Sequence, residues 1–568
     1  MSKIDAVTRH WDVIVVGSGV AGLVTATVCS LHGLKVLVCE KTGFFGGTTA
    51  WSMGAVWAPC NSLMEKLAQV DDPASAESYL RAATGAYFDP AMARAYVESA
   101  SQAIGYLQKN TQVRFAAAML PDFFDAEGAR SGRALLTEPY DGKALGAYLS
   151  KLRNPLSCFT AFGAMQVDLR EVPRLRGASK SIPDFRYTAR RVGGFLLDLL
   201  RYGKGARLTN GNALVGRLLR SALDAGVVLR TDTAVVRVVK VNGKLSGVVA
   251  KHDGQEQALN ARLGVVLAGG GFGSNATMMQ EHVPQPSSHI SVQPEGNTGD
   301  GLMLGVSAGG VLGQGNQDDA YYMPASVRRD RDGKIVQKYP HFGGNALPGS
   351  LIVDASGQRF VNEASNYHHI GREMNRLNIG TAYLIADERY VTNRGLGLVK
   401  PGRVGRNKFL ATGYLKKAND LSALAHLLGI EPERLAGTVS RFNEFAARGI
   451  DVDFGRGTSR YDQASGDPTQ RPNPNLGQLQ QPPYYALAIH PGSASTALGL
   501  KTTPDAQLLD RDGAPIAGLY AVGLDQSSFV GGTLPAGGVL IGSGVVFGYR
   551  AALAIAASVD APLIEPTT

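Results

Sequence analysis

Three glycines and one acid near the start of the chain have the types and spacing of a phosphate-binding site. Gly17, Gly19 and Gly22 form a GxGxxG pattern directly after the apolar run 13–16, and Glu40 ends the next apolar run. Glycines permit a tight turn whose backbone N–H groups approach a pyrophosphate at the N-terminus of the following helix. A carboxylate roughly 20 residues further on can accept hydrogen bonds from a ribose. The pattern therefore predicts a dinucleotide-binding site.

These residues need a strand, a helix and a second strand to hold them in place. Residues 12–40, DVIVVGSGVAGLVTATVCSLHGLKVLVCE, supply the three elements in that order, with the glycine turn between the first strand and the helix. A glycine turn alone is weak evidence, but here the strands, the helix and the terminal acid all follow the expected order. We predict a Rossmann-type unit over this stretch.

The segment after the acid favours FAD over NAD. Residues 43–59 are rich in glycine and small hydroxyl side chains, where a flavin enzyme lays backbone N–H groups along its cofactor. Two distant segments support this prediction: a hairpin and buried strand over 234–275, and a strand over 515–525 followed by a glycine loop and an apolar helix over 531–552. The N-terminal dipole of that helix could face the flavin pyrimidine, so the far end of the chain completes the fold.

The predicted cofactor contacts come from all of these segments. They are Gly17, Ser18, Gly19, Ala21, Gly22, Glu40, Lys41, Gly47, Thr48, Thr49, Ala50, Ser52, Gly54, Ala55, Val235, Ala268, Gly269, Gly270, Asp300, Gly523, Asp525, Gly537, Val539 and Leu540.

Composition excludes several classes of protein. The net charge is +9, but the basic residues are scattered, so we expect no nucleic-acid partner. The four cysteines, at 29, 39, 60 and 158, have no metal-like spacing, and we expect no metal site, no disulfide and a reducing, cytoplasmic location. We find no apolar segment before the first strand and no run of about 18 apolar residues, so we expect neither a secretory signal nor a membrane span.

At 568 residues the chain should form two or more domains. We predict an α/β fold: a Rossmann-type, glutathione-reductase-like FAD-binding domain with an inserted α+β substrate or cap domain. The FAD-binding domain covers 8–280, with a helical insertion around 62–205, and closes with 482–568, while 281–481 form the second domain. Such an insertion places a ligand cleft between the domains, over the flavin.

Over nearly its whole length the sequence resembles the fumarate reductase and succinate dehydrogenase type of flavoprotein, and within these the 3-ketosteroid dehydrogenases. The matching motifs are PGSLIVDASGQRFVNEASNY at 348–367, NTGDGLMLG at 297–305, the series from RFNEFAARG to NPNLG at 441–477, and GLYAVG with the closing glycine-rich helix. The resemblance implies FAD bound non-covalently, because no histidine stands in 43–59 to link the flavin.

The charge of the motifs indicates the kind of substrate. The dicarboxylate branch of this superfamily binds two carboxylates with arginines and uses an arginine as proton donor. The corresponding stretches here, NEASNYHHIG and GGTLPAGGVL, contain no arginine to stand over the flavin edge. We therefore expect a small, apolar ketone as substrate and an external electron acceptor.

The resemblance also implies a chemistry and its residues. In the family a hydrogen bond acidifies the carbon next to a ring ketone, a tyrosinate removes its proton, and hydride leaves for flavin N5. We assign Tyr322, of the pair Tyr321 and Tyr322, as the base, with Tyr321 lining the pocket. Gly538 matches the family glycine whose N–H binds the ketone oxygen.

Two family tyrosines are missing from this chain. Leu534, before Pro535, replaces one, and Phe123 and Phe124 stand where the other would follow a Pro-Asp pair. We place these four side chains in the substrate pocket together with His490, a possible proton carrier whose alternative role is structural. Replacements for the lost hydroxyls could come from Tyr140, Tyr187, Tyr367 or His368.

Three functions stay open at this point. The leading one is desaturation of the bond α,β to a ring ketone, in a steroid or a smaller cyclic ketone. The others are an ene-reductase that runs the reverse reaction on an enone, and a flavin-binding electron carrier that needs a partner. The apolar residues around 195–200 and Phe123 with Phe124 either pack in the core or contact a membrane surface peripherally.

Overall fold

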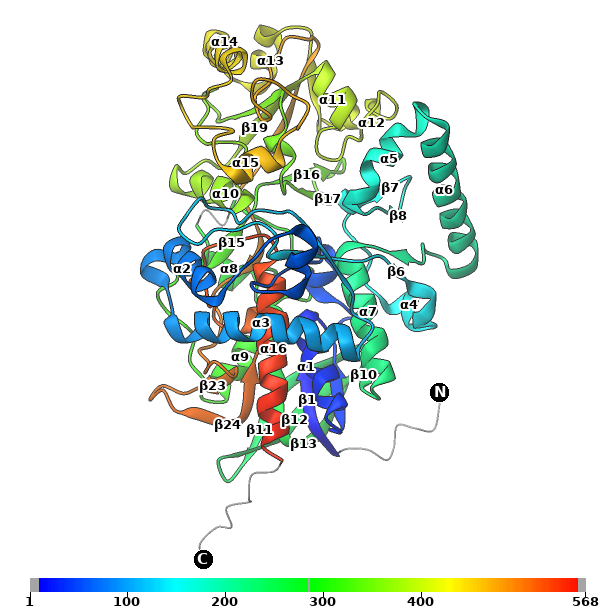
Figure 1. The fold of residues 1–568 in the computed structure, drawn as a ribbon, viewed down its shortest axis with the longest axis vertical. Coiled ribbons are helices and arrows are strands. Elements are labelled where there is room, and N and C mark those ends of the chain that lie inside the picture. The colour runs from blue at the N-terminus through cyan, green and yellow to red at the C-terminus, as the bar shows by residue number, and fades with distance from the viewer. Residues whose placement is uncertain (1–9, 285–286, 560–568) are drawn as a thin grey trace, which may run out of the picture.

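The first strand, helix and second strand form as the sequence predicts. In the computed structural model, which describes residues 10–284 and 287–559, β1 (His10–Val16) leads through the glycine turn into α1 (Val20–Leu31) and then β2 (Val36–Cys39) (Figure 1). The two strands pair in parallel from Val13 with Val36 to Val16 with Cys39. Residues 8–9 of the predicted first domain, the N-terminal stretch 1–9 judged to carry no signal, and 560–568 of the closing part lie outside the described residues.

The central sheet joins segments from both ends of the chain. Its order is β10-β2-β1-β13-β12-β11, and β24 pairs in parallel with β13 and carries β23 beside it. The bounds are β10 Val228–Arg230, β11 Thr233–Val241, β12 Lys244–His252, β13 Gln255–Leu267, β23 Gln507–Leu509 and β24 Pro515–Ala521. The predicted hairpin is β11 and β12, and the predicted buried strand is β13. This arrangement confirms the α/β fold class.

Alternate side chains of β1 enter two cores. Val13 and Val15 pack with the helices α1, α7 (Asn210–Asp224) and α16 (Val539–Ala557). The alternating residues Ile14 and Val16 belong to the core on the opposite face, which also contains residues of β11–β13. Burial on both faces is typical of a parallel sheet between layers. The same core includes Leu304 of α9 (Asp300–Ser307), so α9 lies with the nucleotide-binding layer, although the predicted boundary at 281 assigned it to the second domain.

The C-terminal helix α16 lies directly against α1. Thr25 Oγ1 donates to Gly548 O at 3.1 Å, and a Cβ at Gly544 would lie 2.8 Å from Val20 Cγ1. This 19-residue helix is apolar and long enough to cross a membrane, which corrects the expectation that the chain has no such run. Because 61% of its most apolar window is buried inside the protein, α16 is a core helix.

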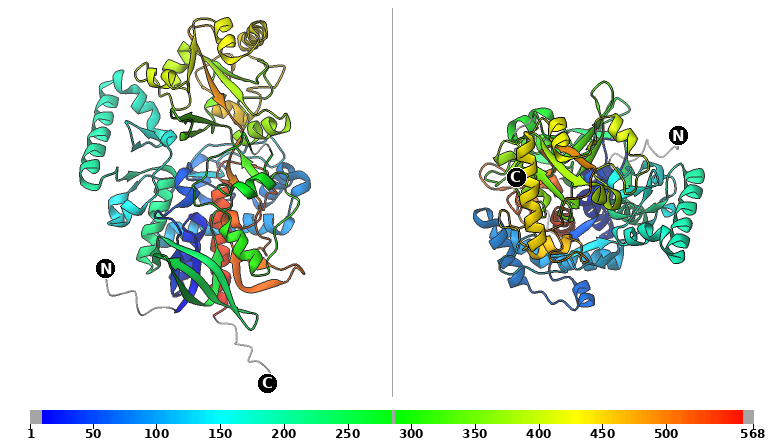
Figure 2. Two further views of the ribbon diagram at one scale, coloured as in Figure 1. Left: turned by 180° about the vertical axis from the view of Figure 1, so that it is seen from behind. Right: turned by 90° about the horizontal axis from the view of Figure 1, so that it is seen from above.

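The helical insertion surrounds one side of the sheet and extends beyond it. Its first long helices, α2 (Pro73–Thr84) and α3 (Pro90–Asn110), each begin with proline after an aspartate cap, Asp72 and Asp89. The remaining elements are β3 Ala55–Trp57, β4 Phe115–Ala117, β5 Ala134–Thr137, β6 Tyr140–Asp141, α4 Tyr148–Lys151, β7 Thr160–Ala161, β8 Met165–Gln166, α5 Val172–Arg176, α6 Ile182–Tyr202 and β9 Arg207–Leu208. Figures 1 and 2 show α5 and α6 as a flap at the side of the molecule.

The second domain is built on an antiparallel sheet with the order β18-β19-β21-β20. Its strands are β18 Ser350–Val353, β19 Ala382–Asp387, β20 Lys416–Ala418 and β21 Tyr484–Ile489, and its helices are α10 Tyr367–Arg376, α11 Glu388–Arg394, α12 Asn407–Ala411, α13 Leu421–Leu428, α14 Pro432–Arg448 and α15 Arg460–Ser465. Between the domains lie α8 Ala276–His282, β14 Ile290–Ser291, β15 Ala320–Tyr322, β16 Ala325–Arg329, β17 Ile335–Pro340 and β22 Gly492–Thr496. This domain sits above the nucleotide-binding sheet (Figure 1).

Candidate active site

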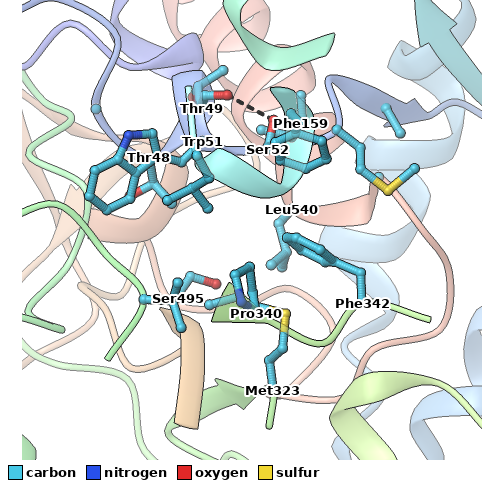
Figure 3. Close-up of a pocket in the computed structure, with 18 of the residues that line it drawn as sticks. Thr48, Thr49, Trp51, Ser52, Phe159, Met323, Pro340, Phe342, Ser495 and Leu540 are labelled. Atoms are coloured by element: carbon cyan, nitrogen blue, oxygen red, sulfur yellow. Dashed lines mark hydrogen bonds between the residues drawn. The ribbon is translucent and has the colours of Figure 1, made fainter. Parts of the chain in front are cut away.

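A cavity of about 780 Å³ lies where the nucleotide-binding layer, the helical insertion and the second domain meet. Figure 3 shows part of its wall: Thr48, Thr49, Trp51 and Ser52 follow the first Rossmann unit, and residues from the second domain and the linking strands face them. The cavity thus extends from the glycine turn to the second domain.

The glycine turn leaves no room for side chains. Gly17 has φ +109°, and a Cβ there would lie 2.2 Å from Ala268 O. A Cβ at Gly22 would lie 2.2 Å from Gly17 O, so this glycine lets α1 start close against the strand. Gly19, by contrast, faces the cavity, and a Cβ there would have only Thr49 Oγ1 nearby, at 3.7 Å. The turn therefore presents bare backbone to the cavity, as a pyrophosphate requires.

Glu40 is held beside this turn. Its Oε2 accepts from Ser18 Oγ at 2.6 Å, and its Oε1 accepts from Thr42 N at 2.9 Å. Lys41, next in the chain, forms an ion pair with Asp300 on the cavity wall. Glu40 lines the cavity with its carboxylate fixed, in the position from which an acid binds a ribose in dinucleotide folds.

Most residues predicted to contact the cofactor line this cavity, and five lie behind its wall. Those that line it are Gly17, Ser18, Gly19, Ala21, Glu40, Lys41, Gly47, Thr48, Thr49, Ser52, Ala55, Val235, Ala268, Gly269, Gly270, Asp300, Gly523, Gly537 and Leu540. Those that do not are Gly22, Ala50, Gly54, Asp525 and Val539. The lining set, with its glycine cradle and fixed acid, fits FAD.

Asp525 has a structural role instead of the predicted contact. Its carboxylate accepts from the backbone N–H of Gly269 at 2.5 Å and of Gly271 at 3.0 Å. Burial raises its pKa to about 6, while these N–H groups act in the opposite direction. Asp525 therefore ties the C-terminal segment to the glycine turn after β13.

The N-terminus of α16 opens into the same cavity. Gly538, with φ +91°, caps the helix, and a Cβ there would lie 2.8 Å from Trp57 N. Gly537, Gly538 and Leu540 line the cavity. The first N–H groups of a helix have no intrahelical acceptor and carry its positive dipole end. This end of the helix can therefore bind an oxygen that carries negative charge, as Gly538 was predicted to do.

Aromatic side chains form the wall toward the second domain. The rings of Phe123 and Tyr461 have centroids 4.6 Å apart, and Tyr367 meets Phe123 and Phe342 edge-on at 6.3 and 5.9 Å. Burial raises the pKa of Tyr461 to about 12. Burial also raises the pKa of Tyr367, and the nearby phenols of Tyr461 and Tyr321 raise it further. Tyr367 was one of the four predicted replacements, whereas Tyr461 was not predicted.

The predicted pair Tyr321 and Tyr322 does not reach the cavity. β15 and β22 change register between these two residues. The Tyr321 hydroxyl lies 2.6 Å from Ser528 Oγ, and the Tyr322 ring stacks on His368 at 5.5 Å. Burial raises the pKa of both phenols, and nearby Asp318 adds to the effect. The assignment of Tyr322 as base is therefore corrected, because its side chain packs in the core beside Phe272.

Three residues of the predicted substrate pocket also lie elsewhere. The His490 ring contacts Thr381 Oγ1 at 3.1 Å and Gly380 O at 3.2 Å, away from the cavity, so it is not placed to carry protons there. Pro535 O accepts from Phe123 N at 2.9 Å, and Phe124 packs against the core. Phe123 and Leu534 do line the cavity.

The other proposed replacements for the lost hydroxyls are engaged elsewhere. Tyr140 lies under the Arg217 guanidinium at 4.9 Å, Tyr187 donates to Glu171, and His368 lies 3.5 Å from Asp318.

The cavity contains arginine, contrary to the expectation from the two motif stretches. Arg153 donates to Thr42 Oγ1 at 3.0 Å, next to Glu40, and Arg394 pairs with Asp467 at the opposite, second-domain end. Both come from loops or helices whose sequence gives no sign of the cavity. Like Tyr461 and Phe342, they are brought to the site only by the packing of the second domain and the insertion.

Comparison with known proteins identifies the family. The profile of the FAD binding domain family matches residues 12–541. The chain belongs to this family. It is 35% identical to the 4-oxocyclohex-2-ene-1-carboxylate 5-dehydrogenase of Sinomonas cyclohexanicum over 95% of its own length and 92% of that protein. It is 33% identical to the 3-oxosteroid 1-dehydrogenase of Mycobacterium tuberculosis, over 96% of this chain and 98% of that protein.

A solved structure agrees with these relatives. The crystal structure of 3-ketosteroid delta1-dehydrogenase from Sterolibacterium denitrificans, in complex with 1,4-androstadiene-3,17-dione, superposes with a TM-score of 0.89 at 32% identity. The match covers 97% of this chain and 100% of that one. The chain is thus an FAD-dependent oxidoreductase related to the 3-ketosteroid dehydrogenases, as its motifs predicted.

The glycine turn supplies a test of the cofactor site. We expect Gly17→Ala to abolish stable FAD binding, because the new Cβ would collide with Ala268 O and the residue would keep a positive φ. The measurement is the flavin content of the purified protein, from absorbance near 450 nm relative to protein. Gly105→Ala, in α3 with no atom within 4 Å of the added Cβ, is the matched control and should retain FAD. Full occupancy in Gly17→Ala would contradict the placement.

Proposed function

We propose that this flavoprotein removes two hydrogens from the carbons α and β to a ring ketone. The names of its relatives support this reaction, since each acts on a ring ketone or oxosteroid. The single observation that carries the proposal is that Tyr367 and the N-terminus of α16 line one cavity together with the glycine turn. A proton acceptor and an oxyanion site are what this reaction needs beside a flavin.

The ketone oxygen would bind at the N-terminus of α16. There the Gly538 N–H can donate to it, and the helix dipole stabilises the negative charge that develops as the α-carbon loses its proton. Leu534, buried at 1% exposure on the same wall, contributes no hydroxyl. The backbone donor therefore carries more of the stabilisation than in relatives with a tyrosine there.

Tyr367 is placed to handle the α-proton. Tyr367 lines the cavity, its ring is fixed between Phe123 and Phe342, and the neighbouring phenol of Tyr461 can pass the proton on. FAD, when bound, supplies the acceptor for the β-hydrogen as hydride. Phe123 and Phe342 exclude water from this region, which keeps the phenol's proton transfer directed to the substrate.

Substituting the two phenols separates these assignments. Tyr367→Phe should slow anaerobic flavin reduction by a cyclic ketone by about 10²- to 10⁴-fold, the usual contribution of a positioned base, while FAD stays bound. Tyr322→Phe, which changes a buried phenol outside the cavity, should retain the rate within about threefold. Stopped-flow absorbance of the flavin measures both. Equal rates in wild type and Tyr367→Phe would remove the proposed base.

The raised pKa of Tyr367 predicts that the rates of dehydrogenation and of enone reduction depend differently on pH. Below that pKa the phenol keeps its proton, so the tyrosinate needed for dehydrogenation is a small fraction that grows about tenfold per pH unit. The rate of flavin reduction should therefore rise steadily from pH 7 to 10. The reverse reaction, enone reduction, needs the protonated phenol and should stay flat over the same range. Reoxidation of reduced enzyme by an enone, followed anaerobically, measures the second profile, and a falling dehydrogenation profile would contradict the assignment.

The protonated phenol is also the specific observation that favours an ene-reductase as the second candidate function. A neutral Tyr367 can donate a proton to the α-carbon of an enone, the reverse of the step in which its anion accepts one from a ketone. The rates of flavin reduction by a ketone and of flavin reoxidation by an enone, compared at one pH, decide which direction the enzyme favours.

We further propose that α6 binds a membrane surface peripherally. Ile182, Phe185, Leu196 and Leu200 follow one another at helical spacing, and Ile182 and Leu200 are 71% and 86% exposed. Arg186, Arg190 and Arg201 are exposed on the same helix. Basic residues beside an exposed apolar stripe favour a bilayer with anionic headgroups. Phe195, predicted as part of this face, is buried.

Vesicle sedimentation tests this surface. The protein should co-sediment with vesicles that contain about 30% phosphatidylglycerol and much less with pure phosphatidylcholine. Leu200→Asp should weaken the binding several-fold, because it places a negative charge in the apolar stripe. Leu427→Asp, at an exposed leucine of α13 far from α6 in sequence, is the control. Equal sedimentation of the two variants would rule out α6 as the contact.

A further inference from the structure

The end of the cavity at the second domain carries an excess of positive charge. Arg394 lines the cavity beside Tyr390, and Arg176, at the end of α5, lies close enough for the two guanidinium groups to repel each other. Arg456 is fully buried behind the same wall and donates to Asn345 O at 3.0 Å. Burial raises the pKa of the Tyr390 phenol, and the positive charges of Arg394, Arg456 and Arg176 lower it.

Only part of this charge is balanced by acids. Arg394 pairs with Asp467. Arg456 contacts Glu363 at 3.2 Å, but Glu363 also binds Arg359, which is shared in turn with Asp451. For Arg176 no acidic group lies within ion-pair distance among residues 10–284 and 287–559. About one positive charge, that of Arg176, is therefore left uncompensated beside Arg394, although Arg176 itself is not part of the cavity lining.

A buried carboxamide at the same place makes no hydrogen bond of good geometry within the described residues. Asn345 is 2% exposed and lines the cavity, and neither its Oδ1 nor its Nδ2 makes a hydrogen bond within the protein. The His341 ring lies beside it, with its Nε2 3.0 Å from Ser326 Oγ. Burial lowers the pKa of His341, and the side-chain contact with Asn345 opposes that shift. A buried amide left unpaired costs about 1–3 kcal/mol, so such a group is expected to have a polar partner when the cavity is filled.

We infer that this end of the cavity is a carboxylate-binding subsite, so that the preferred substrates are small ring ketones that carry a carboxylate. Arg394 and Arg176 supply the charge, and Asn345 Nδ2 supplies a directed hydrogen bond to a carboxylate oxygen. The inference rests on the proposed function for the other end, where the ketone oxygen binds at Gly538. It replaces the expectation of a neutral, apolar substrate. The name of one relative, which acts on an oxocyclohexene carboxylate, agrees with it.

Binding of unreactive ligands to the FAD-loaded enzyme tests the subsite without turnover. Cyclohexanecarboxylate and cyclohexanecarboxamide have the same ring but differ in charge, and their affinities can be measured by calorimetry or by the shift of the flavin absorbance. We expect the carboxylate to bind at least tenfold more tightly. Raising the salt concentration should reduce this preference, because part of the attraction is between partly exposed charges.

Three variants assign the preference to residues. Arg176→Gln should reduce the carboxylate affinity several-fold and leave the carboxamide unchanged. Since Arg176 makes no ion pair within the described residues, this change should not disturb the fold. Asn345→Ala should lower the affinity for both ligands, because it removes a hydrogen bond that is available to either of them. Arg174→Gln is the matched control on α5, since Arg174 pairs with Asp184 instead.

Equal affinities for carboxylate and carboxamide, or equal effects of Arg176→Gln and Arg174→Gln, would overturn the subsite. Flavin bleaching by 4-oxocyclohexanecarboxylate is measured separately and tests the reaction. A carboxylate preference without bleaching would support the subsite and refute the proposed function. Bleaching without a carboxylate preference would support the proposed function and refute the subsite.

Discussion

The close contact between α1 and α16 is the constraint on which the site depends. The two helices come from opposite ends of the chain, yet a Cβ at Gly548 would lie 2.9 Å from Ala21 O. Thr25 bridges them with bonds to Ala21 O and Gly548 O. Because the glycines of α16 allow this close approach to α1, the N-termini of both helices open into one cavity. In the proposed function, one dipole end would bind a pyrophosphate and the other a reacting oxygen.

A second set of contacts connects the insertion to this helix pair. Arg133 is fully buried and binds both Asp71 and Asp122, and Asp122 also accepts from Trp57 Nε1 at 2.8 Å. The next residue, Phe123, donates its N–H to Pro535 O, just before α16 begins. Because a buried arginine between two acids is costly to break, the loop that carries Phe123 is held firmly against the start of α16. The aromatic wall and the helix N-terminus are therefore fixed relative to each other.

Sequence reasoning succeeded where function depends on local order and failed where it depends on packing between distant segments. The first βαβ unit, Glu40 and the glycines before α16 could be predicted, because each of these features is encoded in one continuous stretch. Tyr321 and Tyr322 could not be placed correctly, because a register shift in a short strand decides which way the two side chains point. Tyr461 and Arg394 could not be found at all, since the packing of the second-domain helices α15 and α11 brings them to the cavity.

The two tyrosines missing from the family pattern have different consequences. Phe123 packs against Tyr461, so a hydroxyl still lies beside Tyr367 although it comes from another segment. Leu534 itself supplies no hydroxyl to the cavity, and losing one oxyanion donor can raise a barrier by about 3 kcal/mol. Binding energy from a remote part of a substrate can offset such a loss by fixing the reacting atoms against the remaining donor. A carboxylate held at Arg394 and Asn345 would supply that energy. A simple apolar ketone has no group to bind there, and so the lost donor and the charged end of the cavity favour the same class of substrate.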